Sequence, residues 1–384
     1  MRRFALTMTS LITSAVLLVG CAATATTTSS TTTTGTTSGT TSTTTVDTSL
    51  ATADVDWADL PTTEVTLTDK GLSITEAGTY VLSGSTTGQV VVDTDGYVRI
   101  ILNGATITST AGAAIQVDSA ETAVIELADG TTNTVSDAST RSDEEIDGAI
   151  YSADDLIITG TGTLNVTAAF ADGIVGKDDL LIESGTITVK SADDGIRGKD
   201  SLTITGGTIT IDAKGDGIKS SNDTDSGKGQ LAITGGVLTI TTGDDAVKAE
   251  QRLTITGGTV DIVSSVEGIE APVIVIDGGD ITVNASDDGI NAAASAIITT
   301  GLGITINGGD ITIVMGAGDT DAIDSNGDLT ITGGTLTITV QSPFDFDGTG
   351  TLTGGTITVN GAQVTELTNQ MMGGGGGGGG RPGA

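Results

Sequence analysis

The sequence predicts an all-β fold of the β-solenoid class, with coils of about 22 residues. Three observations predict it: two short signals that recur along the chain, an alternation of aliphatic residues with threonine, and a scarcity of aromatic residues. Of 384 residues, 57 are glycine and only 2% are aromatic. Aromatic side chains usually supply much of the buried area of a globular core. The core must therefore come from small β-branched side chains, which favour strands.

The two recurring signals are an acidic turn followed by an aliphatic residue, and a Gly-Gly step between two short strands. The acidic turns contain Asp172, Asp193, Asp194, Asp216, Asp244, Asp245, Glu267, Asp287, Asp288 and Asp321. The glycine pairs end at Gly207, Gly236, Gly258, Gly279, Gly309, Gly334 and Gly355, and the shortest intervals between them are 21 and 22 residues. The longer intervals contain insertions at 221–229 and 292–303. A fixed period of this length is typical of a solenoid.

The segments around each glycine pair read as strands. In 202–211, Leu202, Ile204, Ile209 and Ile211 alternate with threonines, which places the aliphatic side chains on one face. Helical periodicity is absent from the sequence. Three short strands per coil, each coil about 4.8 Å from the next, give a single-stranded parallel β-helix, which we expect to occupy residues 53–366.

The two ends of the sequence differ from this repetitive body. Residues 1–20 have a basic start and an apolar stretch, which is the pattern of a signal peptide. Leu18-Val19-Gly20-Cys21 resembles the bacterial lipobox, so we expect lipidation at Cys21 and an exported protein held at the cell envelope by its lipid anchor, facing the extracellular side or the periplasm. Residues 21–52 read as a disordered Thr/Ser-rich tether, and 367–384 as a disordered Gly-rich tail.

The charge of the sequence excludes several functions. The formal net charge is −34 and there is no histidine. A chain this acidic repels nucleic acid, and the lack of histidine excludes histidine-based catalysis and the commonest zinc sites. We expect a monomer that attracts cations.

A residue that recurs in every coil forms a column along the solenoid. The acidic turns therefore bring carboxylates within roughly 5–7 Å of one another. Like charges at this distance repel by on the order of 1 kcal/mol in water. Such oxygen clusters suit Ca²⁺, which takes about six to eight oxygen ligands. The predicted calcium ligands are Asp172, Asp193, Asp194, Asp216, Asp223, Asp225, Asp244, Asp245, Glu267, Glu270, Asp287, Asp288, Asp321 and Asp324. Among them, Asp223 and Asp225 belong to the insertion at 221–229, which we expect to close around an ion beside Asp216 and Asp245. For any single aspartate, ordinary Asp-Gly turn formation is the competing explanation.

Basic residues accompany only part of this column. Arg197, Lys199, Lys219 and Lys248 lie beside the middle coils. They either compensate the acids or bind an acidic ligand, since Arg and Lys pair well with carboxylates. Residues 267–324 contain no Lys or Arg, so these are the coils where we expect a cation to be needed.

Several motifs in fixed order suggest a family. The runs at 78–84, 98–104, 127–133 and 178–180, together with the Asp-Asp-Gly-Ile turns, resemble the bacterial pectate-lyase-like carbohydrate-binding domain family. The resemblance implies a right-handed parallel β-helix, bound Ca²⁺, and binding to acidic polysaccharide such as polygalacturonate (pectin), with cellulose as a further ligand. It carries over to the turn residues Asp193, Asp194, Asp216, Asp244, Asp245, Asp287 and Asp288. Ala246 and Ala322 replace the usual glycine and Glu267 replaces aspartate, which puts those three coils in doubt as sites.

Three functions follow from these observations. The first is a surface protein that binds acidic polysaccharide through calcium and through Arg197, Lys199, Lys219 and Lys248. The second is a calcium-dependent polysaccharide lyase, in which Arg197 or Lys219 would act as the base. The third is a structural or adhesive solenoid. Because the acidic turns recur in coil after coil, they favour binding over catalysis, and no catalytic residue is assigned unless the chain is a lyase.

Overall fold

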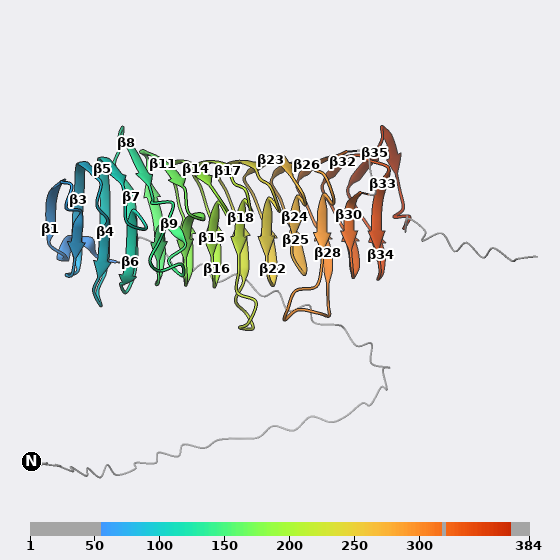
Figure 1. Cartoon of the computed structure of the whole chain (residues 1–384). Helices are drawn as coiled ribbons and strands as arrows, with labels where there is room; N and C mark the ends of the chain where they lie inside the picture. Colours follow the sequence, from blue (N-terminus) through green and yellow to red (C-terminus); the bar gives the residue numbers. More distant parts are fainter. Residues whose placement is uncertain (1–54, 317–319, 370–384) are drawn as a thin grey trace, which may run out of the picture. The chain divides into compact units, whose positions relative to one another are not determined.

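The computed structural model describes residues 55–316 and 320–369, which all belong to one compact unit spanning residues 45–384 (Figure 1). The expected signal peptide at 1–20, the lipidation site Cys21, the tether at 21–52 and residues 370–384 of the expected tail lie outside the described residues. No helix within the described part is long and apolar enough to cross a membrane.

The described chain is almost entirely β-structure, arranged in two sheets, with a short 3₁₀ helix η2 (Trp57–Asp59) near its start. The smaller sheet has twelve strands: β2 (Leu72–Ile74), β4 (Val90–Asp93), β6 (Ile115–Ser119), β9 (Gly148–Ser152), β12 (Asp172–Gly176), β15 (Ile196–Gly198), β18 (Ile218–Ser220), β21 (Val247–Ala249), β24 (Ile269–Glu270), β27 (Ile290–Ala292), β30 (Asp321–Ser325) and β33 (Ser342–Phe346).

The larger sheet has 24 strands in two parallel series that share β5. One series is β1 (Thr62–Leu67), β3 (Gly78–Thr86), β5 (Val98–Thr108), β7 (Ala123–Leu127), β10 (Leu156–Gly160), β13 (Asp179–Ile182), β16 (Ser201–Ile204), β19 (Gln230–Ile233), β22 (Arg252–Ile255), β25 (Val273–Ile276), β28 (Gly303–Ile306), β31 (Asp328–Ile331) and β34 (Gly350–Leu352). The other is β8 (Thr132–Ser136), β11 (Thr163–Ala168), β14 (Thr186–Ser191), β17 (Thr208–Asp212), β20 (Val237–Thr241), β23 (Thr259–Ser265), β26 (Asp280–Ala285), β29 (Asp310–Met315), β32 (Thr335–Thr339) and β35 (Thr356–Val359), closed by β36 (Ala362–Val364).

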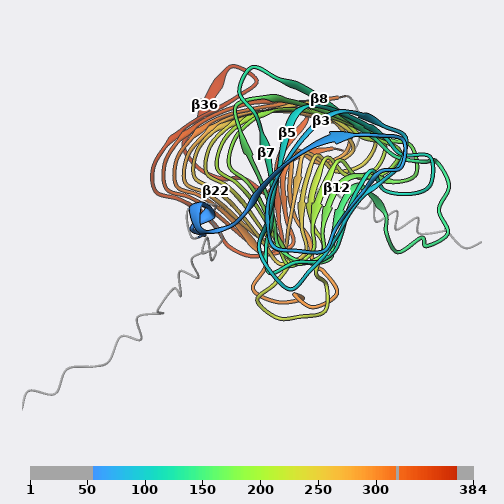
Figure 2. The ribbon, with the colours of Figure 1, turned by 90° about the vertical axis from the view of Figure 1, so that its left-hand side faces the viewer.

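Successive strands pair in parallel and stack behind one another (Figures 1 and 2). In the twelve-stranded sheet, Ile174 pairs with Ile196, Ile196 with Ile218, and Ile218 with Val247, so that partners lie 22, 22 and 29 residues apart. The larger interval contains the insertion at 221–229. It and the later insertion project as two loops beneath the stack (Figure 1). The predicted all-β fold of stacked parallel strands is confirmed, and it is consistent with a β-solenoid.

The core is a set of aliphatic ladders that run along the stack. Leu202, Ile204, Ile209 and Ile211 are all buried, as the alternation predicts, and each pairs with an aliphatic residue in the next coil. Threonines of β17 point outward and are exposed. A parallel sheet buries this stripe because each coil covers the one before it.

The Gly-Gly steps have a backbone reason. Gly207 and Gly236 have φ values of +92° and +90°, and the second glycine of every pair named above has a positive φ. A Cβ at Gly236 would lie 3.0 Å from the backbone of Gly206 in the preceding coil. Only glycine meets both requirements without strain, so these turns fix where each coil bends.

The two described ends differ from the middle of the stack. Trp57 of η2 packs against a small outer cluster of Val124, Ile157 and Leu181, and the Arg99 guanidinium lies 5.1 Å from the centre of its ring. At the other end, β36 pairs antiparallel with β35. An antiparallel terminal strand interrupts the parallel template for another chain.

Candidate functional site

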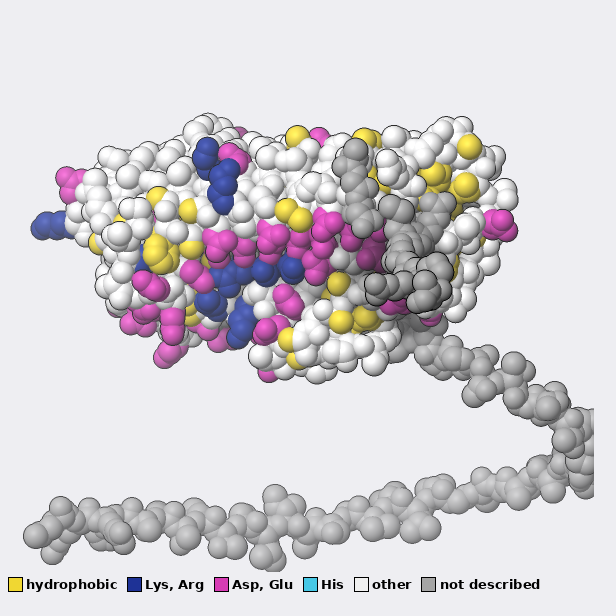
Figure 3. Space-filling view, turned by 45° about the vertical axis from the view of Figure 1, so that its right-hand side comes forward, with side chains coloured by type: hydrophobic (Ala, Val, Ile, Leu, Met, Phe, Trp, Pro, Cys, Tyr) yellow, Lys and Arg dark blue, Asp and Glu magenta, His cyan; other side chains and the backbone are white. Residues whose placement is uncertain are grey.

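The acidic turns form one row beside the twelve-stranded sheet, called here the acidic row: Asp172, Asp194, Asp216, Asp245, Glu267, Asp288 and Asp321. A second row, called here the partner row, consists of residues paired strand to strand: Gln116, Tyr151, Val175, Arg197, Lys219, Lys248, Glu270, Asn291, Asp324 and Asp345. Figure 3 shows acidic side chains in a line with basic side chains directly beside part of it.

The acidic row has a structural role in the backbone. The amide of Asp194 donates to Oδ1 of Asp172 over 3.0 Å, and the amide of Asp216 donates to Oδ1 of Asp194 over 2.8 Å. Asp245 and Asp321 donate in the same way to the aspartates of their preceding coils. One oxygen of each accepting carboxylate therefore joins two coils. This agrees with turn chemistry as the explanation for single aspartates.

The second oxygen of the middle acids faces the partner row. Nε of Arg197 donates to Oδ2 of Asp172 over 2.8 Å. Lys219 Nζ lies 2.7 Å from Oδ2 of Asp216, and Lys248 Nζ lies 2.6 Å from Oδ2 of Asp245. The row of bases predicted from the sequence thus compensates the buried acids within the protein. Arg197 also pairs with Asp147.

The sequence predicts that the acids of the later coils lack a basic partner, and the structure differs from this prediction at Glu270. Glu270 has no basic neighbour in its own coil, but Lys248 reaches across to its Oε2 over 3.1 Å. Beyond it, Nδ2 of Asn291 donates to Oε2 of Glu267 over 2.9 Å. The Oδ1 atom of Asn291 is buried without a hydrogen-bond partner. No described Lys or Arg forms an ion pair with Asp288 or with Asp324, Asn291's strand partner.

Several of these acids have raised pKa values. Burial, followed by repulsion from Asp172 and Asp216, raises the pKa of Asp194 to about 7. Burial also raises the pKa of Asp288 to about 7, with Asp324 as the strongest repulsive neighbour, and raises that of Asp324 to about 6. Because these carboxyl groups are desolvated, their ionised forms need a positive partner.

Neither base proposed for a lyase is prepared to accept a proton. Burial lowers the pKa of the Arg197 guanidinium, but attraction to Asp172 and Asp147 outweighs it, and the pKa is raised. The Lys219 ammonium behaves likewise, because its attraction to Asp216 and Asp194 outweighs burial. A general base near neutral pH needs a lowered pKa, so these two residues are better suited to holding charge than to removing a proton.

Within the described residues, four groups of three carboxylates have ligand oxygens within 4.8 Å of one another: Asp172, Asp193 and Asp194; Asp216, Asp244 and Asp245; Asp245, Glu267 and Glu270; and Asp155, Asp178 and Asp179. Arg197, Lys219 and Lys248 already form ion pairs with some of the acids in the first three groups. The predicted ligands Asp193, Asp244 and Asp287 are exposed at the turns.

The insertion at 221–229 separates its two predicted ligands. Asp223 lines the cavity described below, together with Glu250. Asp225 instead accepts from Nδ2 of Asn222 over 3.2 Å, and Asn222 also donates to Asp200 over 2.7 Å. The structure therefore places Asp225 with Asp200. The sequence predicts Asp225 beside Asp216 and Asp245, and the structure does not bring these three residues together.

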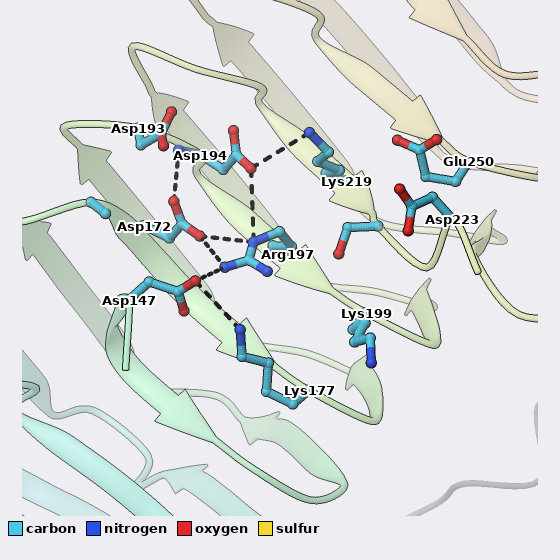
Figure 4. Close-up of a pocket in the computed structure, with 12 residues that line it drawn as sticks. Asp147, Asp172, Lys177, Asp193, Asp194, Arg197, Lys199, Lys219, Asp223 and Glu250 are labelled. Atoms are coloured by element: carbon cyan, nitrogen blue, oxygen red, sulfur yellow. Dashed lines mark hydrogen bonds and ion pairs between the residues drawn. The ribbon is translucent and has the colours of Figure 1, made fainter. Parts of the chain in front are cut away.

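A charged cavity of about 500 Å³ opens over β12, β15 and β18 (Figure 4). Its basic lining consists of Lys177, Arg197, Lys199 and Lys219, and its acidic lining of Asp147, Asp172, Asp193, Asp194, Asp223 and Glu250. Lys177 Nζ lies 3.4 Å from Asp147. Lys199 forms no side-chain ion pair or hydrogen bond with any residue in the described part of the chain. It is a half-buried cation available to a ligand.

Three residues at this site were not among the metal ligands or ligand contacts predicted from the sequence: Asp147, Lys177 and Tyr151. Asp147 and Gly148 precede Ala149 and Ile150, a variant of the acidic turn that the repeat could have revealed. Lys177 lies over the Tyr151 ring, with Nζ 5.8 Å from its centre. Tyr151 carries no repeat signal, because its strand partners are Gln116 and Val175.

Comparison with known proteins gives the family. A family model described as carbohydrate-binding domain-containing protein matches residues 68–319, more than half of the chain. A protein of Acetivibrio thermocellus with the same description is 38% identical over 135 residues, covering 33% of this chain and 47% of that protein. The chain thus spans about half the length of this curated relative. A solved structure of the polysaccharide lyase-like protein from C. thermocellum, a gadolinium derivative, is 34% identical with a TM-score of 0.49 and covers 56% of this chain and 92% of its own. On the family match, the chain belongs to the family of carbohydrate-binding domain-containing proteins.

Proposed function

We propose that this protein binds an acidic polysaccharide, such as polygalacturonate, along the outer face of the twelve-stranded sheet. One observation carries the proposal: Lys199 lines the charged cavity without an ion pair to any described residue, whereas Arg197 and Lys219 are engaged by acids. An ammonium group beside a cavity pairs favourably with a carboxylate. A uronic acid supplies one carboxylate per sugar residue.

Lys177 is the second cation suited to contact the ligand. Its ion pair with Asp147 is long at 3.4 Å, and its side chain is 28% exposed. The Arg197 guanidinium is held by Asp172 and Asp147 and is more deeply buried. Arg197, Lys219 and Lys248, which the sequence suggested as ligand contacts, therefore pair mainly with acids of the middle coils and leave Lys177 and Lys199 to meet the uronates.

We further propose that Ca²⁺ binds in the later coils, around Glu267, Asp288, Asn291 and Asp324. Two observations support the fit: the unpartnered, buried Oδ1 of Asn291, and the lack of an ion-paired base at Asp288 and Asp324 among the described residues. The donors are all oxygens, as Ca²⁺ prefers. When bound, the ion would supply the positive charge these carboxylates lack. Its open positions would accept uronate oxygens.

The proposal also includes the coil size and handedness of the fold, and the export and lipid anchoring of the protein. Partner spacings of 21 and 22 residues support a single-stranded β-helix of about 22 residues per coil. Its right hand is the rule for parallel strands joined by a crossover within one sheet. The lipobox-like sequence ending at Cys21 supports export and a lipid anchor. In this arrangement a monomeric pectin-binding domain is tethered to the cell envelope and faces the extracellular side or the periplasm.

The test is calorimetric titration of the protein with polygalacturonate, with and without EGTA. Lys199→Ala should weaken binding by about 10-fold or more, because it removes one charge-assisted contact. Lys214→Ala is the matched control, since Lys214 is exposed and pairs with Asp212 outside the cavity. Equal affinities of the wild type and Lys199→Ala, with both folded by circular dichroism, would contradict the proposal. EGTA should weaken binding of the wild type.

A further inference from the structure

The partner row continues beyond the charged cavity into uncharged residues. Arg197 of β15 pairs with Val175 of β12, Val175 with Tyr151 of β9, and Tyr151 with Gln116 of β6. Val175 is fully buried between its neighbours, whereas Tyr151 and Gln116 are half-buried. The outer face of the sheet therefore changes from cationic to aromatic and then to amide over four strands.

A second cavity lies at the amide end of this row. Its volume is about 180 Å³, and Gln89, Gln116, Arg141 and Asp143 are among its lining residues. The Arg141 side chain is 2% exposed and pairs with Asp137, but its Nε has no hydrogen-bond partner. A buried donor is costly to leave unpaired, and because Arg141 lines the cavity, an oxygen-bearing ligand there would offer it an acceptor.

Consecutive residues of the chain line the two cavities. Ile146 lines the second cavity, and the next residue, Asp147, lines the charged cavity. Tyr151 belongs to the strand that follows, and Lys177, which lines the charged cavity, lies over its ring. A ligand that runs along the stack from Lys199 would next meet Lys177, then the Tyr151 ring and then Gln116.

The polar groups at the second cavity suit a sugar without a carboxylate. Nε2 of Gln89 donates to Oε1 of Gln116 over 3.2 Å, and Nε2 of Gln116 donates to Asp118 over 2.6 Å. Burial and then Asp147, Asp118 and Asp143 raise the pKa of the Tyr151 hydroxyl. Asp143, which lines this cavity, and Asp118 accept hydrogen bonds from sugar hydroxyl groups and repel a uronate, whereas Asp147 is paired with Arg197 and Lys177.

We propose that Tyr151, Gln116 and the second cavity form a subsite for a neutral sugar residue, next to the uronate position at Lys199. The sugar ring packs on the aromatic face of Tyr151, and its hydroxyl groups bond to the amide and carboxylate oxygens beside it. The preferred ligand is then a polysaccharide in which neutral residues adjoin uronates, rather than a uniform polyuronate. This inference rests on the proposed function and narrows its substrate class.

The test compares three polymers by calorimetric titration: polygalacturonate, a polysaccharide of alternating neutral and uronic residues, and a neutral glucan. The wild type should bind the alternating polymer about tenfold more tightly than polygalacturonate. Tyr151→Ala should remove this preference and leave polygalacturonate binding within about twofold, whereas Tyr151→Phe keeps the ring and most of the preference. Gln116→Ala should weaken only the alternating polymer. Gln363→Ala, an exposed glutamine of β36, is the matched control and should change neither.

The outcomes separate this inference from the proposed function. A wild type that binds both uronate polymers equally well overturns the neutral subsite alone. So does a Tyr151→Ala variant, folded by circular dichroism, that weakens both polymers to the same extent. A wild type that binds neither uronate polymer overturns the proposed function and the subsite together.

Discussion

Replacing Arg197 with alanine should destabilise the protein far more than the loss of an ordinary surface ion pair. The guanidinium bonds to Asp172, whose side chain is 4% exposed, and to Asp147. Without it, Oδ2 of Asp172 is a buried carboxylate oxygen that has lost its charged partner. Breaking a buried ion pair from one side costs about 3–5 kcal/mol, so Arg197→Ala should lower the free energy of unfolding by that amount at pH 8.

The cost should depend on pH. Burial already raises the pKa of Asp172, while Arg197 opposes this effect. Removing Arg197 therefore raises that pKa further. A carboxyl group whose pKa is raised in the folded state contributes its stability at low pH and loses it as pH rises through the folded pKa. Arg197→Ala should accordingly be less destabilised at pH 5 than at pH 8.

The assay is urea unfolding followed by circular dichroism at both pH values, with Lys190→Ala as control. Lys190 pairs with Asp212 at 3.3 Å, but the two side chains are 66% and 46% exposed, so its loss should cost less than about 1 kcal/mol. If Arg197→Ala lost no more stability than Lys190→Ala at pH 8, or if its loss were independent of pH, the assignment of Arg197 as a buried charge partner would be refuted.

Three further predictions concern the acidic row, the glycine turns and the later coils. Asp194→Asn should preserve the acceptor for the Asp216 amide and leave the free energy of unfolding at pH 8 equal or higher. Asp194→Ala removes this acceptor and should cost about 1–3 kcal/mol. Chemical unfolding measures both variants, and equal losses of stability would contradict the role of the Asp194 carboxylate as an acceptor. Gly258→Ala should cost at least about 1–2 kcal/mol in the same assay, because φ is +89° and the new Cβ would lie 2.9 Å from the backbone of Gly235; an unchanged free energy would contradict it. In EGTA the melting temperature should fall as pH rises through 6 to 7, where Asp324 and Asp288 ionise. Ca²⁺ should restore more stability at pH 8 than at pH 5, because it binds the ionised carboxylates. A calcium effect equal at both pH values would contradict the proposed calcium site.

The fold was predictable because its determinants are local and repeated. The alternation in 202–211 assigns the inward residues of two strands, and the glycine at 207 occupies a backbone conformation that other residues adopt only with strain. Each coil repeats the same alternation and the same glycine position, so an ambiguous assignment in one coil is resolved by the equivalent residues of the next coil. The sheet partners of Ile196 and Ile218 follow directly from the spacing of the acidic turns.

The candidate site was less predictable, because it depends on how far side chains reach between coils. The sequence predicts Lys199 as a ligand contact, but its lack of an ion pair with the described residues depends on the direction of the neighbouring acids. Lys248 lies in one coil and pairs with Glu270 of the next, which the sequence neighbours of Glu270 do not reveal. Asp147 and Tyr151 come from a coil where the repeat is weaker, and only their register with the next strands brings them to the site.

The acidic row and the partner row have different roles, and this difference explains how a repetitive fold can carry a specific site. Each accepting acid of the acidic row uses one oxygen to join adjacent coils, so this row cannot vary freely without loss of backbone hydrogen bonds. The partner row makes no such contribution to the turns, and it changes from Gln116 and Tyr151 through Arg197 to Asp324 along the sheet. A polymer lying along the stack would therefore meet neutral, cationic and anionic surfaces in a fixed order. That order, more than the net charge of −34, would set both the sequence and the direction of the sugar chain that fits.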